Sequence, residues 1–495
     1  MKKLRVILCF VFAAILFPWA ASCKKQEESV ATAYRLTLEY DPEKETLSGE
    51  ETVEFENRYE TPLSALKFNL WPNAYREDAV YRPVSESAES TAYYGEKSYG
   101  GITVQSVTGG GEWAVEGEDC NLLCVSLTSP IAQGESVKIH MTFTAALPKI
   151  NHRFGVSDGA VNLGNFYPIL CGRTGSDGAF YETVYYSDGD PFVSDCADYD
   201  VSLTMPEEYI AASTGAEISR ESVNGKTTCR YQAGNVRDFA FVLSGAFKTE
   251  EKEITIAHGG GTNNTVCVKY YYLADENPQE SLRAACEALT YFSKTYGAYP
   301  YATYSVAQTG FCYGGMEYPA LCFISRGLSG KNLNYVIVHE TAHQWWYAAV
   351  GSNQAEEAWQ DEGLAEYSTA CFFEEYKSYG FEKSALLQAA EKEYHAYYSV
   401  YTRVFGGADT RMSRSLKEFV GDYEYRAIAY DKGLMLFSAL ENSVGKAKTE
   451  KALKNYFSAC VYQTATPAHL VAAFEKAGVD VSGLFSSFLE GKAIV

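Results

Sequence analysis

The sequence predicts an α+β protein in which an antiparallel β domain comes first and a mainly helical domain follows. Hydrophobic and polar residues alternate over much of 30–250, as they do in strands that bury one face. Apolar residues then recur at helical spacing, first in 277–297, which has an early proline and a closing glycine. We therefore expect an N-terminal β domain at 30–250 and a helical domain at 251–495.

Composition is that of a folded protein of two or three domains. The chain has 495 residues, of which 46% are hydrophobic and 21% are charged. The net charge is -21, with 63 acidic residues against 42 basic ones. Such a charge argues against nucleic acid or an anionic membrane surface as a partner. The sequence does not indicate an oligomeric state.

The strands of the first half are identified by their alternation. Four runs stand out, namely 34–40, 66–70, 137–143 and 201–205. Glycine-rich and polar stretches such as VTGGGEW separate the runs, and no Gly-Lys-Ser/Thr follows that would make a phosphate loop. These observations favour an antiparallel β domain.

The first residues resemble a bacterial export signal. A basic start leads into an apolar run from Val6 to Ala21, which is short for a membrane span. The small residues before Cys23 resemble a lipobox, which implies a signal peptide at 1–22, lipidation of Cys23 as the mature N-terminus, and a linker at 23–29. Ordinary signal cleavage and an uncleaved anchor are the competing interpretations. We expect an exported, extracytoplasmic lipoprotein that meets the membrane only through the anchor at Cys23.

This assignment predicts that an inhibitor of signal peptidase II leaves the precursor uncut. The measurement is the size of the protein on a gel with and without the inhibitor. Unchanged processing would rule out the lipoprotein.

Eleven cysteines follow Cys23, an odd number without zinc-finger spacing. Cys120 with Cys124, or Cys171 with Cys196, are close enough in sequence to suggest a disulfide. Free cysteines more commonly serve as small buried hydrophobic residues, and a protein of this size needs no disulfide scaffold.

The segment VIVHETAHQWW places two histidines and a glutamate in an apolar helix. At 3.6 residues per turn His339 and His343 lie on one face about 40° apart, which suits a single metal ion. Glu340 lies about 100° from His339, too far to be the natural third ligand but close enough to reach a water on the metal. Polar groups buried here need such a partner, because an unpaired one costs about 1–3 kcal/mol.

A catalytic zinc site needs a third protein ligand. Glu362 lies in a second expected helix, far enough from His343 for the first helix to end at Gly351 and the chain to return. Glu366 is four residues further on the same face and is placed to accept the other N–H of His339.

Together, HETAH and WQDEGLAEY resemble the gluzincin metallopeptidases, and Trp359 before the Glu-Gly pair points to the aminopeptidase N family, peptidase family M1. The resemblance implies one Zn²⁺ ion bound by His339, His343 and Glu362. It also implies a saddle-like β domain and a thermolysin-like catalytic domain. The long helical C-terminal domain of larger members is expected to be absent.

Two further motifs are similar to those of the family. YGGMEYPAL matches its exopeptidase stretch at Gly314, Gly315, Met316 and Glu317, with Tyr318 in place of asparagine, and implies that this stretch binds the substrate amine. YRAIAYDKGLMLF resembles the segment that carries a tyrosine over the zinc, which implies an oxyanion-stabilising role for Tyr430.

The family also uses a β-domain Gln or Glu against the substrate amine. Asn162, Asn165 or a neighbour is expected near that place, although the sequence does not assign one.

The expected function is that of a zinc metalloaminopeptidase acting on peptides with a free N-terminus. A zinc-activated water would attack the peptide bond, with Glu340 as general base. Two different functions stay open, namely another zinc hydrolase on the same site, such as an epoxide hydrolase or an endopeptidase, and a surface binding protein with a vestigial site. The preferred first residue is not indicated.

Overall fold

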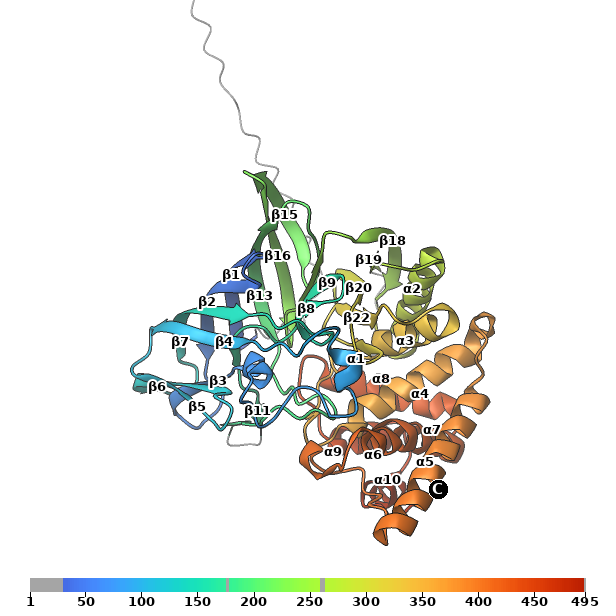
Figure 1. Cartoon of the computed structure of the whole chain (residues 1–495). Helices are drawn as coiled ribbons and strands as arrows, with labels where there is room; N and C mark the ends of the chain where they lie inside the picture. The colour runs from blue at the N-terminus through green and yellow to red at the C-terminus, as the bar shows by residue number, and fades with distance from the viewer. Residues whose placement is uncertain (1–29, 175–177, 259–262, 494–495) are drawn as a thin grey trace, which may run out of the picture.

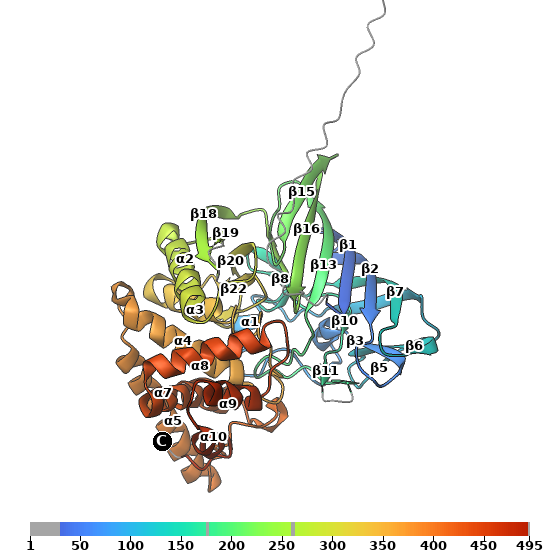
Figure 2. The ribbon, with the colours of Figure 1, turned by 180° about the vertical axis from the view of Figure 1, so that it is seen from behind.

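The computed structural model describes residues 30–174, 178–258 and 263–493, so the expected signal peptide and Cys23 lie outside the described residues. Figure 1 shows a β-rich half beside a helix-rich half, and Figure 2 shows the same arrangement from behind. The predicted fold class is confirmed. Within the described ranges no helix has the length and apolar character needed to cross a membrane.

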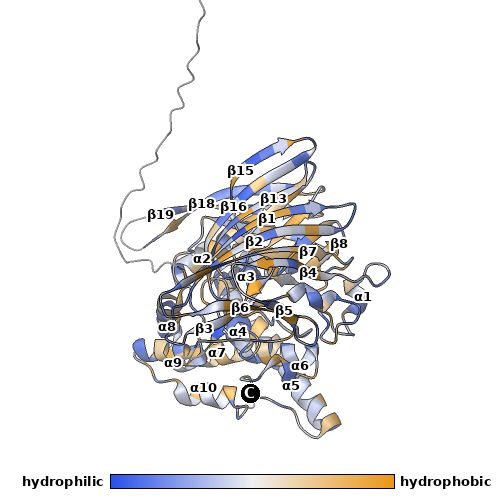
Figure 3. Cartoon of the chain, turned by 90° about the vertical axis from the view of Figure 1, so that its left-hand side faces the viewer, coloured by the Kyte–Doolittle hydropathy of each residue, from blue (hydrophilic) through white to orange (hydrophobic). Residues whose placement is uncertain are grey.

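A mixed seven-stranded sheet forms the body of the first half. In spatial order its strands are β15 (Ala216–Val223), β16 (Lys226–Val236), β13 (Ala197–Pro206), β1 (Thr32–Asp41), β2 (Thr46–Glu56), β7 (Ser136–Ala146) and β4 (Gly101–Thr108). Every neighbouring pair is antiparallel except β1 with β13. On β1, Tyr34, Leu36 and Leu38 are buried while the residues between them face outward, which is the alternation seen in the sequence. Figure 3 shows this alternation as blue and orange bands along the strands.

Smaller sheets complete the first half. One has the order β10 (Ile169–Leu170), β3 (Leu63–Asn69), β6 (Leu122–Ile131) and β5 (Trp113–Glu116). Another has the order β14 (Ile210–Ser213), β17 (Phe241–Ser244), β9 (Ala160–Leu163) and β8 (Phe154–Ser157). The short elements are β11 (Arg173–Thr174), β12 (Ala179–Phe180), η1 (Trp71–Tyr75) and α1 (Glu89–Ala92).

The second half begins with a five-stranded sheet. Its order is β18 (Lys248–Ala257), β19 (Asn263–Tyr272), β20 (Thr303–Thr309), β22 (Leu321–Ser325) and β21 (Gly315–Met316). Helix α2 (Pro278–Thr295) packs on β18 and β19, and α3 (Gly330–Ala342) packs on β21 and β22. The division of the chain at residue 250 stays a prediction, although this sheet begins close to it.

Helices fill the rest of the second half. They are α4 (Trp359–Glu375), η2 (Lys377–Tyr379), α5 (Lys383–Phe405), η3 (Leu416–Glu418), α6 (Asp422–Arg426), η4 (Ala427–Asp431), α7 (Lys432–Val444), α8 (Lys446–Cys460), α9 (Pro467–Lys476) and α10 (Ser482–Leu489). Helix α4 packs against α3 on one side and α7 on the other, so it lies at the centre of this half.

Helix α3 ends earlier than expected. The sequence suggested an end at Gly351, but the regular helix stops at Ala342. His343 still has helical backbone angles, so its spacing to His339 is preserved. Beyond it the chain folds back on itself, since Tyr347 has a φ of 136° and its N–H donates to the carbonyl of Val350. The residues from Trp345 to Val350 are all buried, which is why they looked like more helix.

The eleven described cysteines are all free, and seven of them are buried. Neither Cys120 with Cys124 nor Cys171 with Cys196 forms a disulfide. The cysteines therefore serve mainly as small hydrophobic residues of the core.

Arg237 joins the two halves of the chain. It follows β16, is 2% exposed, and donates hydrogen bonds to the carbonyls of Tyr347 and Gln463, each at 2.7 Å. It also donates to the carbonyl of Ser194 at 2.7 Å. A buried guanidinium with its donors satisfied by three separate segments fixes the β domain against the segment that follows His343.

Candidate functional site

His339 and His343 lie one turn apart at the end of α3, and α4 brings Glu362 against them. The Nε2 atoms of the two histidines are 3.2 Å apart. The Oε2 atom of Glu362 is 3.4 Å from the first nitrogen and 3.3 Å from the second. All three side chains are buried. The structure thus brings the three residues predicted as metal ligands together.

These spacings fit one zinc ion. Bonds of about 2.0–2.1 Å to a tetrahedral centre separate the donor atoms by about 3.3–3.4 Å. The Oε2 atom of Glu362 is buried and accepts no hydrogen bond from any residue in the described ranges. An unpartnered buried carboxylate oxygen is costly, and a cation held by the three donors would remove that cost.

Other groups orient the two histidines. The Nδ1 atom of His343 is 2.9 Å from the carbonyl oxygen of Trp346, so donation there leaves Nε2 free to bind a metal. Glu366 lies where the sequence placed it, with Oε1 at 3.3 Å from Nδ1 of His339. The hydroxyl of Tyr335 donates to Oε2 of Glu366 at 2.6 Å. The contact of His343 fixes its ring orientation and raises its basicity as a ligand. Nδ1 of His339 makes no hydrogen bond with the described residues, so Glu366 is a neighbouring carboxylate and not a hydrogen-bond partner here. Trp346 and Tyr335 were missed because neither contact has a sequence signal.

Glu340 lies beside the donor set without belonging to it. Carboxylate or nitrogen atoms of Glu340, Glu317 and His343 lie within 4.8 Å of one another. A Cβ atom at Gly315 would be 2.3 Å from Oε1 of Glu340, so any side chain there would displace this carboxylate. The Oε2 atom of Glu340 is buried and has no hydrogen-bond partner among the described residues.

Negative charge is in excess at this site. Burial raises the pKa of Glu340 to about 8, and nearby Glu362 adds to the effect while His343 opposes it. Burial likewise raises the pKa of Glu317 to about 8. Burial alone would lower the pKa of His343, but the carboxylates of Glu317 and Glu362 raise it well above its usual value. A bound cation would relieve this excess.

The structure adds an acid that the sequence analysis missed. Asp190, from an irregular segment of the β domain, has a carboxylate oxygen within 4.8 Å of those of Glu317 and Glu362. Its side chain forms a buried ion pair with Arg153. Gln354 was also missed, and its Nε2 donates to Oε1 of Glu317 at 3.3 Å. Loop residues such as these have no periodicity that would identify them.

The two asparagines expected near the amine site lie elsewhere. Asn162 donates to the carbonyls of His152 and Gly310, and Asn165 donates to Asp238. Neither lines the cavity. Among the described residues of the β domain, Asp190 has a carboxylate that reaches the metal-binding groups.

A cavity of about 660 Å³ lies over these groups and is lined by both halves of the chain. Gly314, Gly315 and Glu317 contribute to its wall. Met316 does not line the cavity. Its side chain is buried and points toward Arg153, with its sulfur 3.1 Å from Nε of that residue. Met316 therefore supports this wall from behind.

Tyr430 lies over the donor set. It belongs to η4, a short π-helical turn, and its ring is nearly parallel to that of His339 with centroids 6.0 Å apart. Its hydroxyl donates to Oε1 of Glu362 at 2.6 Å. The position is the one the sequence motif implied, and π-helical turns occur frequently at functional sites.

Two motif glycines let α4 and α7 approach closely. A Cβ atom at Gly433 would be 2.6 Å from the Cα atom of Gly363, and one at Gly363 would be 2.9 Å from that of Gly433. The close approach brings Tyr430, just before α7, to Glu362 on α4.

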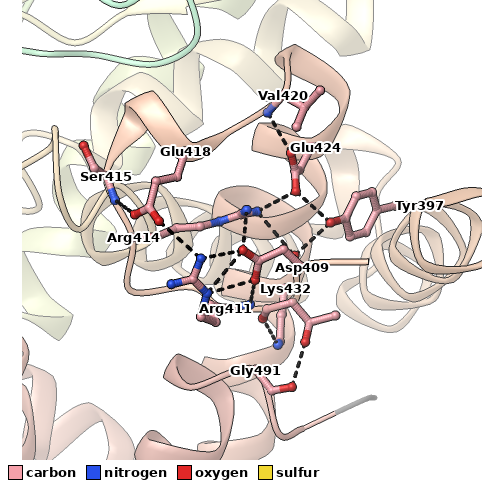
Figure 4. Close-up of polar contacts among 11 residues, drawn as sticks. Tyr397, Asp409, Arg411, Arg414, Ser415, Glu418, Val420, Glu424, Lys432 and Gly491 are labelled. Atoms are coloured by element: carbon pink, nitrogen blue, oxygen red, sulfur yellow. Dashed lines mark hydrogen bonds and ion pairs between the residues drawn. The ribbon is translucent and has the colours of Figure 1, made fainter. Parts of the chain in front are cut away.

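Buried ionic groups hold the π-helical turn at both ends (Figure 4). Before it, Glu424 on α6 accepts from Arg414 at 3.0 Å and from the hydroxyl of Tyr397 at 2.9 Å. After it, Nζ of Lys432 donates to the carbonyl of Thr410 at 2.6 Å. Burial lowers the pKa of Lys432 to about 8.

The sequence of the second half matches the model of the peptidase family M1 domain over residues 280–488. This part of the chain belongs to peptidase family M1. The resemblance inferred from the motifs is confirmed, and the donor set, Glu317, Glu340 and Tyr430 all lie inside the M1 domain. The family is one of zinc metallopeptidases, and the donor set described above could hold one such ion.

Curated relatives of this M1 domain include leucine aminopeptidase 2 of Emericella nidulans, which is 31% identical over 172 residues. That match covers 32% of this chain and 26% of the relative, so the chain spans about a quarter of the relative's length.

Solved structures share the fold of both halves. An M1 zinc metallopeptidase mutant from Deinococcus radiodurans, bound to a Tyr-Ser-Ala substrate, is 18% identical with a TM-score of 0.64. The match covers 94% of this chain and 95% of that one. A two-domain M1 zinc metallopeptidase mutant bound to L-tryptophan gives a TM-score of 0.66 at 18% identity, over 94% of this chain and 96% of that one.

The donor geometry predicts that the M1 domain binds one Zn²⁺ ion per chain. Glu366→Ala should weaken zinc affinity by about 10–100-fold, because it removes the carboxylate that could accept the N–H of His339. Glu362→Ala should weaken it further, and Glu340→Ala should leave the ion bound. Competition with a chromogenic chelator measures all three. Loss of zinc from Glu340→Ala alone would contradict the ligand assignment.

The contact between α4 and α7 predicts that Gly433→Ala destabilises the protein by about 1–3 kcal/mol, because a methyl group forces two backbones apart. Gly483→Ala is the matched control, since a Cβ atom at that helical glycine meets nothing within 4 Å. It should be neutral or stabilising by up to about 1 kcal/mol. Urea denaturation of both variants measures the difference, and equal effects would show that the close approach is unimportant.

Proposed function

We propose that this protein is a zinc-dependent aminopeptidase that removes N-terminal residues from peptides. The observation that carries the proposal is one cavity containing a three-donor metal site, Glu340 beside it, and two further carboxylates, Glu317 and Asp190. The leucine aminopeptidase relatives and the peptide-bound structure support the same chemistry for the domain.

His339, His343 and Glu362 would hold the ion. When bound, zinc acts as a Lewis acid on the scissile carbonyl and makes a water molecule much more acidic. The carbonyl of Trp346 keeps the imidazole of His343 in the orientation that this binding requires, and Glu366 lies 3.3 Å from Nδ1 of His339, where it could accept the N–H of that ring.

Glu340 is proposed to move the proton. Its carboxylate is within reach of the donor set, and its Oε2 atom is free of hydrogen bonds from the described residues. It would accept a proton from the attacking water and pass it to the leaving amine. The absence of a side chain at Gly315 leaves room for this carboxylate, since a Cβ atom there would be 2.3 Å from its Oε1.

Tyr430 is proposed to stabilise the oxyanion. A hydroxyl over the donor set can donate to the oxygen on which negative charge develops, and loss of one such donor costs about 2.7–4 kcal/mol. Its present bond to Glu362 shows that the hydroxyl reaches the metal-binding groups.

Glu317 and Asp190 are proposed to bind the free α-amine of the substrate. Two carboxylates whose oxygens lie within 4.8 Å of each other and of Glu362 form an acceptor site for an ammonium group. An acylated N-terminus offers no ammonium group to Glu317, which receives a hydrogen bond from the neutral amide of Gln354, whereas Asp190 is already paired with Arg153. The lack of a cation for Glu317 disfavours acylated substrates. This pair argues against an endopeptidase, which has no need of it.

An epoxide hydrolase and a vestigial binding protein would need different features from this cavity. An epoxide hydrolase would use the metal site without needing an ammonium acceptor. A vestigial binding protein has no reason to keep the complete donor set together with Glu340 and Tyr430.

The test is hydrolysis of aminoacyl anilides, each free and N-acetylated, with and without a zinc chelator. We expect cleavage of the free-amine set only, lost on chelation and restored by zinc. Glu340→Ala should lower kcat by about 10²–10⁴ while retaining zinc. Glu317→Ala should lose the preference for a free amine. A zinc-loaded protein that cleaves none of these substrates would contradict the proposal.

A further inference from the structure

We infer that Tyr318 positions Glu317 for binding of the substrate amine by attaching the amine-binding wall to the β domain. This wall is the part of the cavity lining that contains Gly314, Gly315 and Glu317. The inference rests on the proposed function. Tyr318 stands where the family motif has asparagine, and its side chain is fully buried.

The wall that carries Glu317 has little regular structure of its own. Its strand, β21, has only two residues, and Ala320 has a positive φ of 56°. Glu317 lines the cavity, whereas Tyr318, the next residue, does not. The position of the carboxylate therefore depends on what holds its neighbours.

Tyr318 is held from the β-domain side. Its hydroxyl donates to Oδ1 of Asn165 at 2.8 Å, and Nδ2 of Asn165 donates to Oδ2 of Asp238. The hydroxyl of Tyr167 donates to Oδ1 of Asp238 at 3.1 Å and lies 2.8 Å from the hydroxyl of Tyr199 on β13. This chain of buried hydrogen bonds runs from the seven-stranded sheet to the residue beside Glu317.

The backbone of the β domain is shaped to receive the hydroxyl. A Cβ atom at Gly164 would lie 1.9 Å from the oxygen of Tyr318, so no other residue fits there. Asn165 has a positive φ of 51°, a conformation that asparagine tolerates better than most residues. Gly164, which has no side chain, and Asn165, whose backbone is left-handed, together leave room for the hydroxyl of Tyr318 and accept its hydrogen bond.

The metal-binding side holds the same wall by its backbone. Gln344, next to His343, donates from Nε2 to the carbonyl of Tyr318 at 3.2 Å and accepts from the N–H of Ala320 at 2.7 Å. The wall is thus fixed between the histidine segment and the β domain. Loss of the tyrosine hydroxyl would leave the attachment through Gln344 and the contact of Met316 with Arg153, and would remove the attachment at Asn165.

Tyr318→Phe tests the inference. It keeps the ring, which packs on Phe323 with centroids 4.9 Å apart, and removes only the hydroxyl. We expect KM for free-amine anilides to rise about tenfold, because the acceptor on Asn165 is left unpaired and the wall loses one of its attachments to the β domain. The value of kcat should change little, since the amine contact is made in both ground state and transition state.

A second variant and a control separate positioning from general damage. Asn165→Ala removes the same attachment from the other side and should give the same rise in KM. Tyr299→Phe removes another buried hydroxyl, which donates to the carbonyl of Thr303, and should leave KM unchanged. Zinc content and thermal stability are measured for each.

The deciding measurement repeats Tyr318→Phe in the Glu317→Ala background. If Tyr318 acts through Glu317, its effect on KM there should fall below about twofold. The inference would be overturned if Tyr318→Phe raised KM equally in the unmodified enzyme and in the Glu317→Ala background. It would also be overturned if Tyr318→Phe did not raise KM in the unmodified enzyme. Either result would leave the proposed function intact. Failure of the unmodified protein to cleave free-amine anilides would overturn both.

Discussion

The burial of four carboxylates in one cavity is the constraint on which the rest of the structure depends. Asp190, Glu317, Glu340 and Glu362 are each at most 7% exposed, and charges removed from water in this way are costly unless they are paired. The chain supplies part of the compensation through Arg153, Gln354 and Tyr430. The two histidines and the cation that they can hold supply the remainder. The compensating groups come from several separate segments, so the fold must bring all of them together.

This requirement explains why the two halves are attached so firmly. Asp190 comes from the β domain, whereas Glu317, Glu340 and Glu362 come from the second half. A small rotation between the halves would move one carboxylate relative to the other three. Arg237 opposes such a rotation by binding carbonyls on both sides, and Arg153 opposes it by reaching both Asp190 and Met316. The domain interface is therefore part of the site.

The groups that could be predicted from sequence are those fixed by helical periodicity. Spacings of four residues placed His339 with His343, and Glu362 with Glu366, on common faces, and the structure brings these residues together. Alternation likewise identified β1, β3, β7 and β13. Asp190 and Gln354 could not be predicted in this way, because irregular segments carry no period and their contacts depend on the whole fold. The end of α3 was missed because the buried turn after His343 has the same apolar composition as a helix.

Tyr430 shows how close packing and charge combine to place one hydroxyl. Gly363 and Gly433 allow the two helices to touch, and the ionic groups around Glu424 and Lys432 fix the π-helical turn between them. The hydroxyl then meets Oε1 of Glu362 rather than solvent. To donate to an oxyanion it must exchange this partner for another nearby, which requires a small rotation of a side chain whose backbone is held at both ends. In the proposed role, a turn held at both ends would keep the donor within a small rotation of the oxygen on which negative charge develops, and such preorganisation is the condition for effective electrostatic stabilisation.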